Sequence, residues 1–247
     1  MKITGDYHIH TVYSDSKTKI EDAFSVADRI GLATLATCDH SFRSYFVGAT
    51  REKLKSQRKE IESLNLKNQR LKGIQSIEAN ILNFEGEIDV PIDLFSSLDM
   101  LSLGFHRFVT KGDGRDRKAF ILKNGWTKAN DPNLTKLNTQ AFIKAMERYP
   151  VDVLCHIGHR TKVEPKPLFE CAASLGVHIE LNEKHIETLE PMIEEALRCG
   201  VKFILGSDAH KAQKIGVFDR VSQVVEKYKI PYDKIVGVDL ELNVRKK

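Results

Sequence analysis

Seven short apolar segments recur along this chain of 247 residues, and helical patterns separate most of them. The apolar segments lie at residues 4–8, 33–37, 73–77, 100–104, 151–155, 177–181 and 201–205. The helical patterns lie at residues 20–30, from 50 to before 73, and at 139–148, 165–175 and 188–199. Short strands that alternate with amphipathic helices predict parallel βα units. Seven such units in succession favour closure into a barrel rather than an open sheet.

The composition allows one α/β barrel and argues against the main alternative fold. With 41% hydrophobic residues, the chain can bury the core of one domain over residues 1–247. A doubly wound nucleotide-binding sheet would need a glycine-rich phosphate loop after the first strand, and the sequence contains neither a GxGxxG nor a Walker motif. We therefore expect a single TIM-like barrel.

Histidines and carboxylates follow the predicted strands. Six of the nine histidines and three carboxylates have such positions, namely His8, His10, Asp15, His40, Glu78, His106, His156, Asp208 and His210. Asp15 lies further along, in a polar loop that can fold back over the first strand. The carboxyl ends of barrel strands meet at one mouth, where the functional residues of such barrels stand. The pattern therefore predicts one cluster of imidazoles and carboxylates.

Each of these residues alone has a structural explanation. A lone HxH pair is often exposed, and an acidic residue after a strand can cap the next helix. Together, however, nine donors in one pocket would carry a large desolvation cost without metal. A catalytic zinc uses about three protein ligands. The set therefore predicts two or three divalent ions with at least one bridging carboxylate.

The motifs around these residues resemble the polymerase and histidinol phosphatase (PHP) superfamily of metal-dependent phosphoesterases. The resemblance spans nearly the whole chain and is closest to the small stand-alone bacterial members. Its carriers are the HxH of His8 and His10, Asp39-His40, the 77–81 segment IEANI, Gly104-Phe105-His106, His156 and the 206–210 segment GSDAH. It implies a distorted (β/α)7 barrel and a trinuclear site that holds zinc, manganese or iron, with zinc favoured.

The resemblance also implies an assignment of ligands to three ions. The first ion would be held by His8, His10, Glu78 and Asp208, the second by Glu78, His106 and His156, and the third by Asp15, His40 and His210. Close relatives often have histidine at the position of Asp15. A carboxylate oxygen is a harder ligand than an imidazole nitrogen, so the third site should favour harder metal ions than it does in those relatives. Which metal it binds, and whether it is filled, stay open.

The implied activity is hydrolysis of a phosphate ester, with a small phosphomonoester as the favoured substrate. A metal-bridged hydroxide would attack phosphorus, with Glu78, His156 and Asp208 as the catalytic ligands. Side chains that follow strand ends are candidates to bind the phosphate, and they are Arg43, Arg107, His159, Arg160 and Lys184. Two alternatives stay open: a nuclease or phosphodiesterase that acts on nucleic acid, and a non-catalytic accessory metal-binding domain.

Other features have no assigned function. His178 is expected to pack in the core, His185 to lie on the surface, and Cys38 and Cys155 to be small buried residues. The segment 107–137 is predicted to be a long loop before a helix capped by Asn138; eight basic and three acidic residues give it a net charge of +5. It would be either a lid over the cluster or a passive insertion.

The sequence also indicates where the protein resides. No apolar stretch approaches the roughly 20 residues that span a bilayer. The first residues lack the apolar core of a secretory signal. The four cysteines form no CxxC pair and no disulfide-rich pattern. We therefore expect a cytoplasmic protein with a small phosphorylated substrate and no membrane contact.

Overall fold

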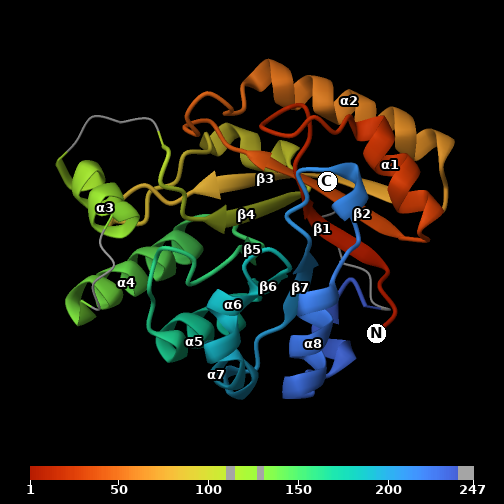
Figure 1. Ribbon diagram of the computed structural model, residues 1–247. Coiled ribbons are helices and arrows are strands. Elements are labelled where there is room, and N and C mark those ends of the chain that lie inside the picture. Colours follow the sequence, from red (N-terminus) through yellow and green to blue (C-terminus); the bar gives the residue numbers. More distant parts are fainter. Residues whose placement is uncertain (110–114, 127–130, 239–247) are drawn as a thin grey trace.

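Eight parallel strands form one sheet in chain order, β1 to β8, and helices lie around it (Figure 1). The computed structural model describes residues 1–109, 115–126 and 131–238. The strands are β1 (Gly5–Ile9), β2 (Thr34–His40), β3 (Lys72–Asn80), β4 (Met100–Gly104), β5 (Val153–Leu154), β6 (His178–Asn182), β7 (Phe203–Gly206) and β8 (Ile235–Val236). This arrangement confirms the predicted TIM-like barrel.

Helices connect consecutive strands. They are α1 (Ile20–Arg29), α2 (Arg51–Lys67), α3 (Arg115–Trp126), α4 (Pro132–Arg148), α5 (Pro165–Leu175), α6 (Ile186–Leu189), α7 (Ile193–Cys199) and α8 (Asp219–Tyr228), with the 3-10 helices η1 (Ile92–Ser97), η2 (Glu190–Met192), η3 (Ala212–Lys214) and η4 (Tyr232–Lys234). None of the helices in the described part of the chain has the length and apolarity needed to span a bilayer.

The closure of the barrel differs between its two ends. At the carboxyl end the segment after β7 joins β1 directly, because His10 N donates to Ala209 O at 2.9 Å and Asp208 N donates to His8 O at 2.8 Å. At the amino end β8 pairs with β7, and Thr4 N donates to Gly237 O at 2.7 Å. The prediction of seven strands missed β8, which has two residues and is too short to show a pattern. The seven predicted strands suffice to close the mouth.

The barrel interior changes from apolar to polar along the strands. Near the amino end it is filled by Tyr7, Ala36, Ile74, Met100, Val153, Ile204 and Val236. Along this interior face β2 presents Ala36, Cys38 and His40, while β3 presents Ile74, Ser76 and Glu78. Since side chains alternate with a period of two, one face of β2 and one face of β3 each carry both core residues and residues of the polar cluster.

Two predicted helix boundaries are wrong for clear physical reasons. The second helix begins at its Thr50 cap, whose hydroxyl accepts from Lys53 N at 3.2 Å, but it ends at Lys67. Gly73 lies in β3, where an added Cβ would be 2.1 Å from the Phe24 ring. This glycine therefore makes room for an aromatic ring. The predicted helix 188–199 is divided into α6, η2 and α7, because Pro191 cannot donate a backbone hydrogen bond.

The segment 107–137 is not one long loop, because it contains α3 and the first part of α4. Asp131 caps α4 by accepting from Asn133 N at 2.9 Å and Leu134 N at 3.2 Å, so the cap predicted at Asn138 is wrong. Phe120 anchors α3 to the barrel with a fully buried ring. Its ring centroid lies 4.9 Å from that of Phe84 and 5.6 Å from that of Phe105. Residues 110–114 and 127–130, together with the Trp126 side chain, lie outside the described residues.

Candidate metal centre

Glu78 in β3 is the centre of the polar cluster at the carboxyl end of the barrel. Its side chain is 1% exposed. Its Oε1 is 2.6 Å from His156 Nε2, 3.2 Å from His106 Nε2 and 3.6 Å from His8 Nε2, while Oε2 is 2.9 Å from His40 Nδ1 and 3.8 Å from His10 Nε2. Each carboxylate oxygen therefore faces a different group of imidazoles. This is the geometry that a bridging carboxylate requires.

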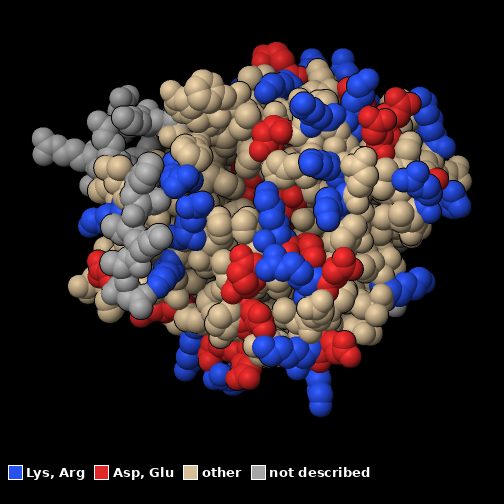
Figure 2. Space-filling view, in the orientation of Figure 1, with Lys and Arg blue, Asp and Glu red and all other residues tan. Residues whose placement is uncertain are grey.

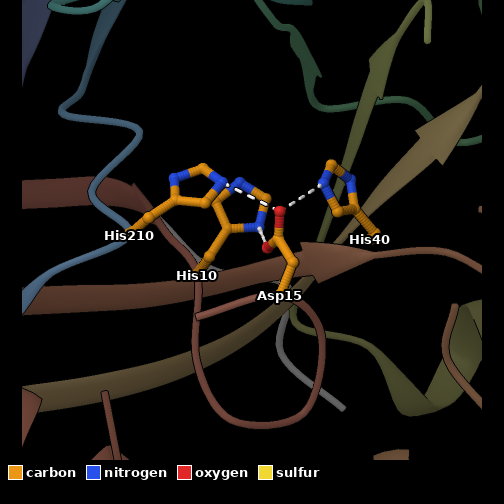
Figure 3. Close-up of side chains that lie close together, drawn as sticks. All are labelled: His10, Asp15, His40 and His210. Carbon is orange, nitrogen blue, oxygen red and sulfur yellow. Dashed lines mark hydrogen bonds and ion pairs between the residues drawn. The ribbon is translucent and has the colours of Figure 1, made fainter. Parts of the chain in front are cut away.

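Asp15 lies in the loop after β1 and points into a second part of the cluster. Figure 3 shows its carboxylate between His40 and His210, with His10 beside them. Asp15 Oδ2 is 3.1 Å from His210 Nε2 and 3.4 Å from His40 Nε2, and Oδ1 is 3.4 Å from His10 Nδ1. The loop thus folds back over the mouth, as predicted, and brings together the ends of β1, β2 and β7.

Asp208 completes the cluster from the segment after β7. Its Oδ1 is 3.5 Å from His10 Nε2 and 3.4 Å from His210 Nδ1. Its backbone has a φ of 53°, in the left-handed region that is unfavourable for a residue with a Cβ. The structure thus brings all nine residues predicted as metal ligands into one connected cluster.

The charges of the cluster are strongly coupled. Burial would raise the pKa of Glu78, but the imidazoles of His106 and His8 hold it well below its usual value. Burial also opposes ionisation of Asp208, and His8 and His10 outweigh it, so this pKa is lowered too. Burial disfavours charge on His40, yet Asp15 and Glu78 raise its pKa to about 10. Both buried carboxylates are therefore anionic at neutral pH and attract positive charge.

The donor set fits divalent transition ions. Four groups of donors each gather within 4.8 Å: His10, Asp15, His40 and His210; His8, His10 and Glu78; His40, Glu78 and His106; and Glu78, Cys155 and His156. Within the described residues, Glu78 Oε2 and His40 Nδ1 are buried without a hydrogen-bond partner, although they lie 2.9 Å apart. Imidazole nitrogen and carboxylate oxygen are common ligands of zinc. Cations would satisfy these atoms.

Of the three predicted ligand sets, only the third, Asp15, His40 and His210, lies within one group, which also contains His10. The group of His8, His10 and Glu78 holds the first set without Asp208, whose Oδ1 lies 3.5 Å from His10 Nε2. The second set is divided, because His106 and His156 contact Glu78 Oε1 in different groups. Cys155 is buried as expected, but its Sγ lies 3.6 Å from Glu78 Oε1. The sequence places this thiol next to His156, and the structure adds its contact with Glu78.

Three polar residues that support the cluster were also missed. Asn80 Oδ1 is 2.7 Å from His106 Nδ1, and Glu180 Oε1 is 2.7 Å from His8 Nδ1. Asp39 accepts from Thr11 N at 2.7 Å and so orders the loop that carries Asp15. Asp39 lies in the Asp39-His40 motif, and Asn80 lies in the 77–81 segment IEANI. The signal for Glu180 is an acidic residue inside an otherwise apolar predicted strand.

A pocket of about 270 Å³ opens beside the cluster. The predicted substrate-binding residues Arg107, His159 and Arg160 line it, together with cluster residues and aromatic side chains. Lys184 lies elsewhere, with Nζ 3.2 Å from Asp208 Oδ1. The structure does not bring Arg43 to this pocket, and the Arg43 backbone N–H donates to Asp89 at 2.9 Å.

The three histidines outside the predicted ligand set differ in position. His185 was expected on the surface, but this is wrong: it is half-buried, with its ring centroid 3.9 Å from that of His159. Burial, with charge repulsion from His185 and His156, lowers the pKa of His159 to about 3. His178 is half-buried at the start of β6, with Nδ1 3.3 Å from Asp152 O.

Comparison with known proteins identifies the family of this chain. The sequence matches the PHP domain over residues 6–240. The chain belongs to the PHP domain family.

Two PHP relatives are named "Probable phosphatase". One from Aliivibrio fischeri (strain MJ11) is 31% identical over 248 residues, which cover 96% of this chain and 89% of that protein. One from Shewanella sp. (strain MR-4) is 27% identical over 254 residues, which cover 96% of this chain and 88% of that protein.

A solved structure shows the same fold. It is that of histidinol phosphate phosphatase from Lactococcus lactis subsp. lactis Il1403, complexed with zinc, L-histidinol and phosphate. The TM-score is 0.60 at 15% identity, and the match covers 91% of this chain and 93% of that one. The likeness supports the PHP barrel as the architecture of this chain.

Proposed function

We propose that this protein is a metal-dependent hydrolase that removes phosphate from a small phosphomonoester at a site for up to three divalent ions, with zinc favoured over manganese or iron. The observation that carries the proposal is the position of Glu78. Its two oxygens each face a separate group of imidazoles, at 2.6–3.8 Å. The probable phosphatases among the relatives support the same activity.

Ions bound there would activate water and neutralise charge on the phosphoryl oxygens. The chain's own residues would position the reaction. Glu78 would bridge two ions, and His156 and Asp208 would be the other catalytic ligands. Lys184 lies 3.2 Å from Asp208 Oδ1, so it would keep that carboxylate anionic and oriented.

The adjoining pocket supports a small substrate. At about 270 Å³ it lies near the lower end of the volumes usual for small-molecule sites. Arg107 and Arg160 supply guanidinium groups that can bind phosphate oxygens in pairs. On the face in Figure 2, Lys and Arg side chains are interspersed with Asp and Glu rather than gathered into one basic band. The described residues on this face therefore form no continuous basic track for a nucleic acid backbone.

A hydrolysis screen tests the proposal. Purified protein would be loaded separately with zinc, manganese or iron and given metabolite phosphomonoesters, p-nitrophenyl phosphate, its bis-ester and a short single-stranded RNA. We expect hydrolysis of monoesters to exceed that of the bis-ester and RNA with at least one metal. Faster cleavage of the bis-ester or RNA would favour the nuclease alternative. No hydrolysis of any substrate with any metal would favour an accessory metal-binding domain.

A further inference from the structure

Glu180 is a buried carboxylate beneath the metal centre, and it touches two sides of the cluster. It lies in β6 and is 2% exposed. Its Oε1 is 2.7 Å from His8 Nδ1, and its Oε2 accepts from the backbone N–H of His156 at 2.8 Å. Asn182 Nδ2 also donates to Oε2, at 3.0 Å. Both oxygens are therefore held, one by the imidazole of His8 in β1 and one by the backbone of His156 after β5.

The barrel is shaped around this carboxylate. An added Cβ at Gly206 in β7 would lie 1.9 Å from Glu180 Oε1 and 2.9 Å from His8 Cβ. Only glycine therefore leaves room there for the contact between Glu180 and His8. His156, whose N–H the carboxylate accepts, has a φ of 33°, which is unfavourable for a residue with a side chain. The hydrogen bond helps to stabilise this conformation.

The other imidazoles of the cluster have different partners at the nitrogen that faces away from it. His106 Nδ1 contacts the neutral amide oxygen of Asn80 at 2.7 Å. His210 Nδ1 contacts the backbone oxygen of Asp208 at 3.0 Å. Within the described residues, His8 is the one cluster histidine whose ring contacts a carboxylate from outside the nine predicted ligands. A carboxylate partner fixes the tautomer of a ligating histidine and makes the ring more basic.

We infer that Glu180 is a positioning residue of the metal centre, an inference that rests on the metal site proposed above. It holds the proton of His8 on Nδ1 and directs Nε2, which lies 3.6 Å from Glu78 Oε1, toward the ions. Through the His156 backbone it also fixes the other side of Glu78. One carboxylate thereby couples the ligands proposed for the first and second ions.

The substitution Glu180→Gln tests this role at nearly constant volume. The amide has one acceptor oxygen, and an NH2 group that only donates replaces the other oxygen. The two atoms therefore cannot accept separately from His8 and from the His156 backbone. We expect the Kd of the most tightly bound zinc, measured by chelator competition, to rise about 10- to 100-fold. Circular dichroism would establish that the variant is folded. A folded variant with the zinc affinity of the wild type would overturn the inference.

Asp6→Asn is the matched control. Asp6 is equally buried in β1, but its carboxylate accepts from the backbone N–H groups of His8, Ser207 and Gly216. This variant should lower the melting temperature while the zinc Kd stays within about threefold of the wild type, well below the change typical of an outer metal partner. Equal losses of zinc affinity in both variants would mean that Glu180 acts only through general stability, contrary to the inference.

A measurement on the wild-type protein covers the case in which Glu180→Gln does not fold. Long-range nitrogen–proton NMR of the zinc-loaded protein should show His8 protonated at Nδ1. Protonation of His8 at Nε2 would contradict the assignment. Neither zinc affinity nor the NMR spectrum requires a substrate, so both results stand even if the phosphatase proposal fails.

Discussion

The amino end of the barrel interior is an apolar layer, whereas the carboxyl end of the same barrel is a cluster of imidazoles and carboxylates. At the amino end, Ile74 and Ala36 belong to an apolar layer in which side chains from seven strands pack together. Four residues further along β3 and β2, Glu78 and His40 face each other in the polar cluster. Because Ala36 and His40 share one face of β2, and Ile74 and Glu78 share one face of β3, these two strands connect the packed core to the cluster.

The backbone conformation also differs between these two layers. The apolar layer is built from regular paired strands. The polar layer includes His156 and Asp208, with φ values of 33° and 53° just beyond the ends of β5 and β7. Such conformations persist only where surrounding contacts hold them. The apolar end therefore supplies stability, whereas the polar end places ligands at some cost in stability.

The largest expected effect follows from changing the centre of the polar layer. Glu78→Gln removes the negative charge that faces five imidazoles. Phosphatase activity should fall by more than the roughly 100-fold typical of losing an outer metal partner, while circular dichroism shows a folded barrel. The same change at Glu62, which is exposed in α2, should leave the rate unchanged. Wild-type activity of Glu78→Gln at matched metal content would contradict the role of Glu78.

Truncation of a side chain in the apolar layer should lower the stability of the protein and leave its kcat nearly unchanged. Ile74 is 1% exposed, and truncation to alanine should lower the free energy of unfolding by about 2–5 kcal/mol. The kcat of the folded fraction should change little. Urea unfolding of chelator-treated protein avoids the contribution of bound metal. Ile92→Ala, at a residue 75% exposed, should change stability by no more than about 0.5 kcal/mol. A large loss of kcat with little loss of stability in Ile74→Ala would contradict the assignment of stability to the apolar layer and of catalysis to the polar layer.

Much of the polar layer could be predicted because its members follow apolar runs. His106 and His156 stand directly after predicted strands, and parallel strands end at one mouth. The same rule selected Arg43, which does not line the pocket beside the cluster; its backbone N–H donates to Asp89, a contact that depends on how the following loop folds. Position after a strand therefore predicts proximity to the mouth, but it does not predict the direction of a side chain.

The missed features depend on lateral contacts that one strand cannot reveal. Glu180 acts on His8, which is 172 residues away in sequence, across the barrel interior. The requirement for glycine at position 206 follows from that contact. Strand β8 has two residues, which is too few for a periodic pattern. The cap of α4 was misplaced because Asp131 and Asn138 both suit a helix start, and only the contacts of Asp131 show which one caps it.

A smaller effect is expected at the edge of the cluster. The pKa of His159 is about 3 in the folded protein, whereas an unfolded chain titrates near the ordinary value of about 6.5. Between these values the unfolded state binds more protons, so stability falls as the pH falls. His159→Gln should therefore lose less stability than the wild type between pH 7 and pH 5. Solvent screening of this half-buried group should keep the difference below about 1 kcal/mol. Chemical unfolding at both pH values would measure it, and identical pH dependence would contradict a neutral His159.

We propose that the polar end of the barrel binds several ions around Glu78. Elemental analysis of protein prepared without chelator and reconstituted with zinc would measure how many ions are bound. We predict more than one transition ion per chain, removal of these ions and of activity by a chelator, and recovery of both on adding metal. One ion or fewer per folded chain after reconstitution would contradict the claim.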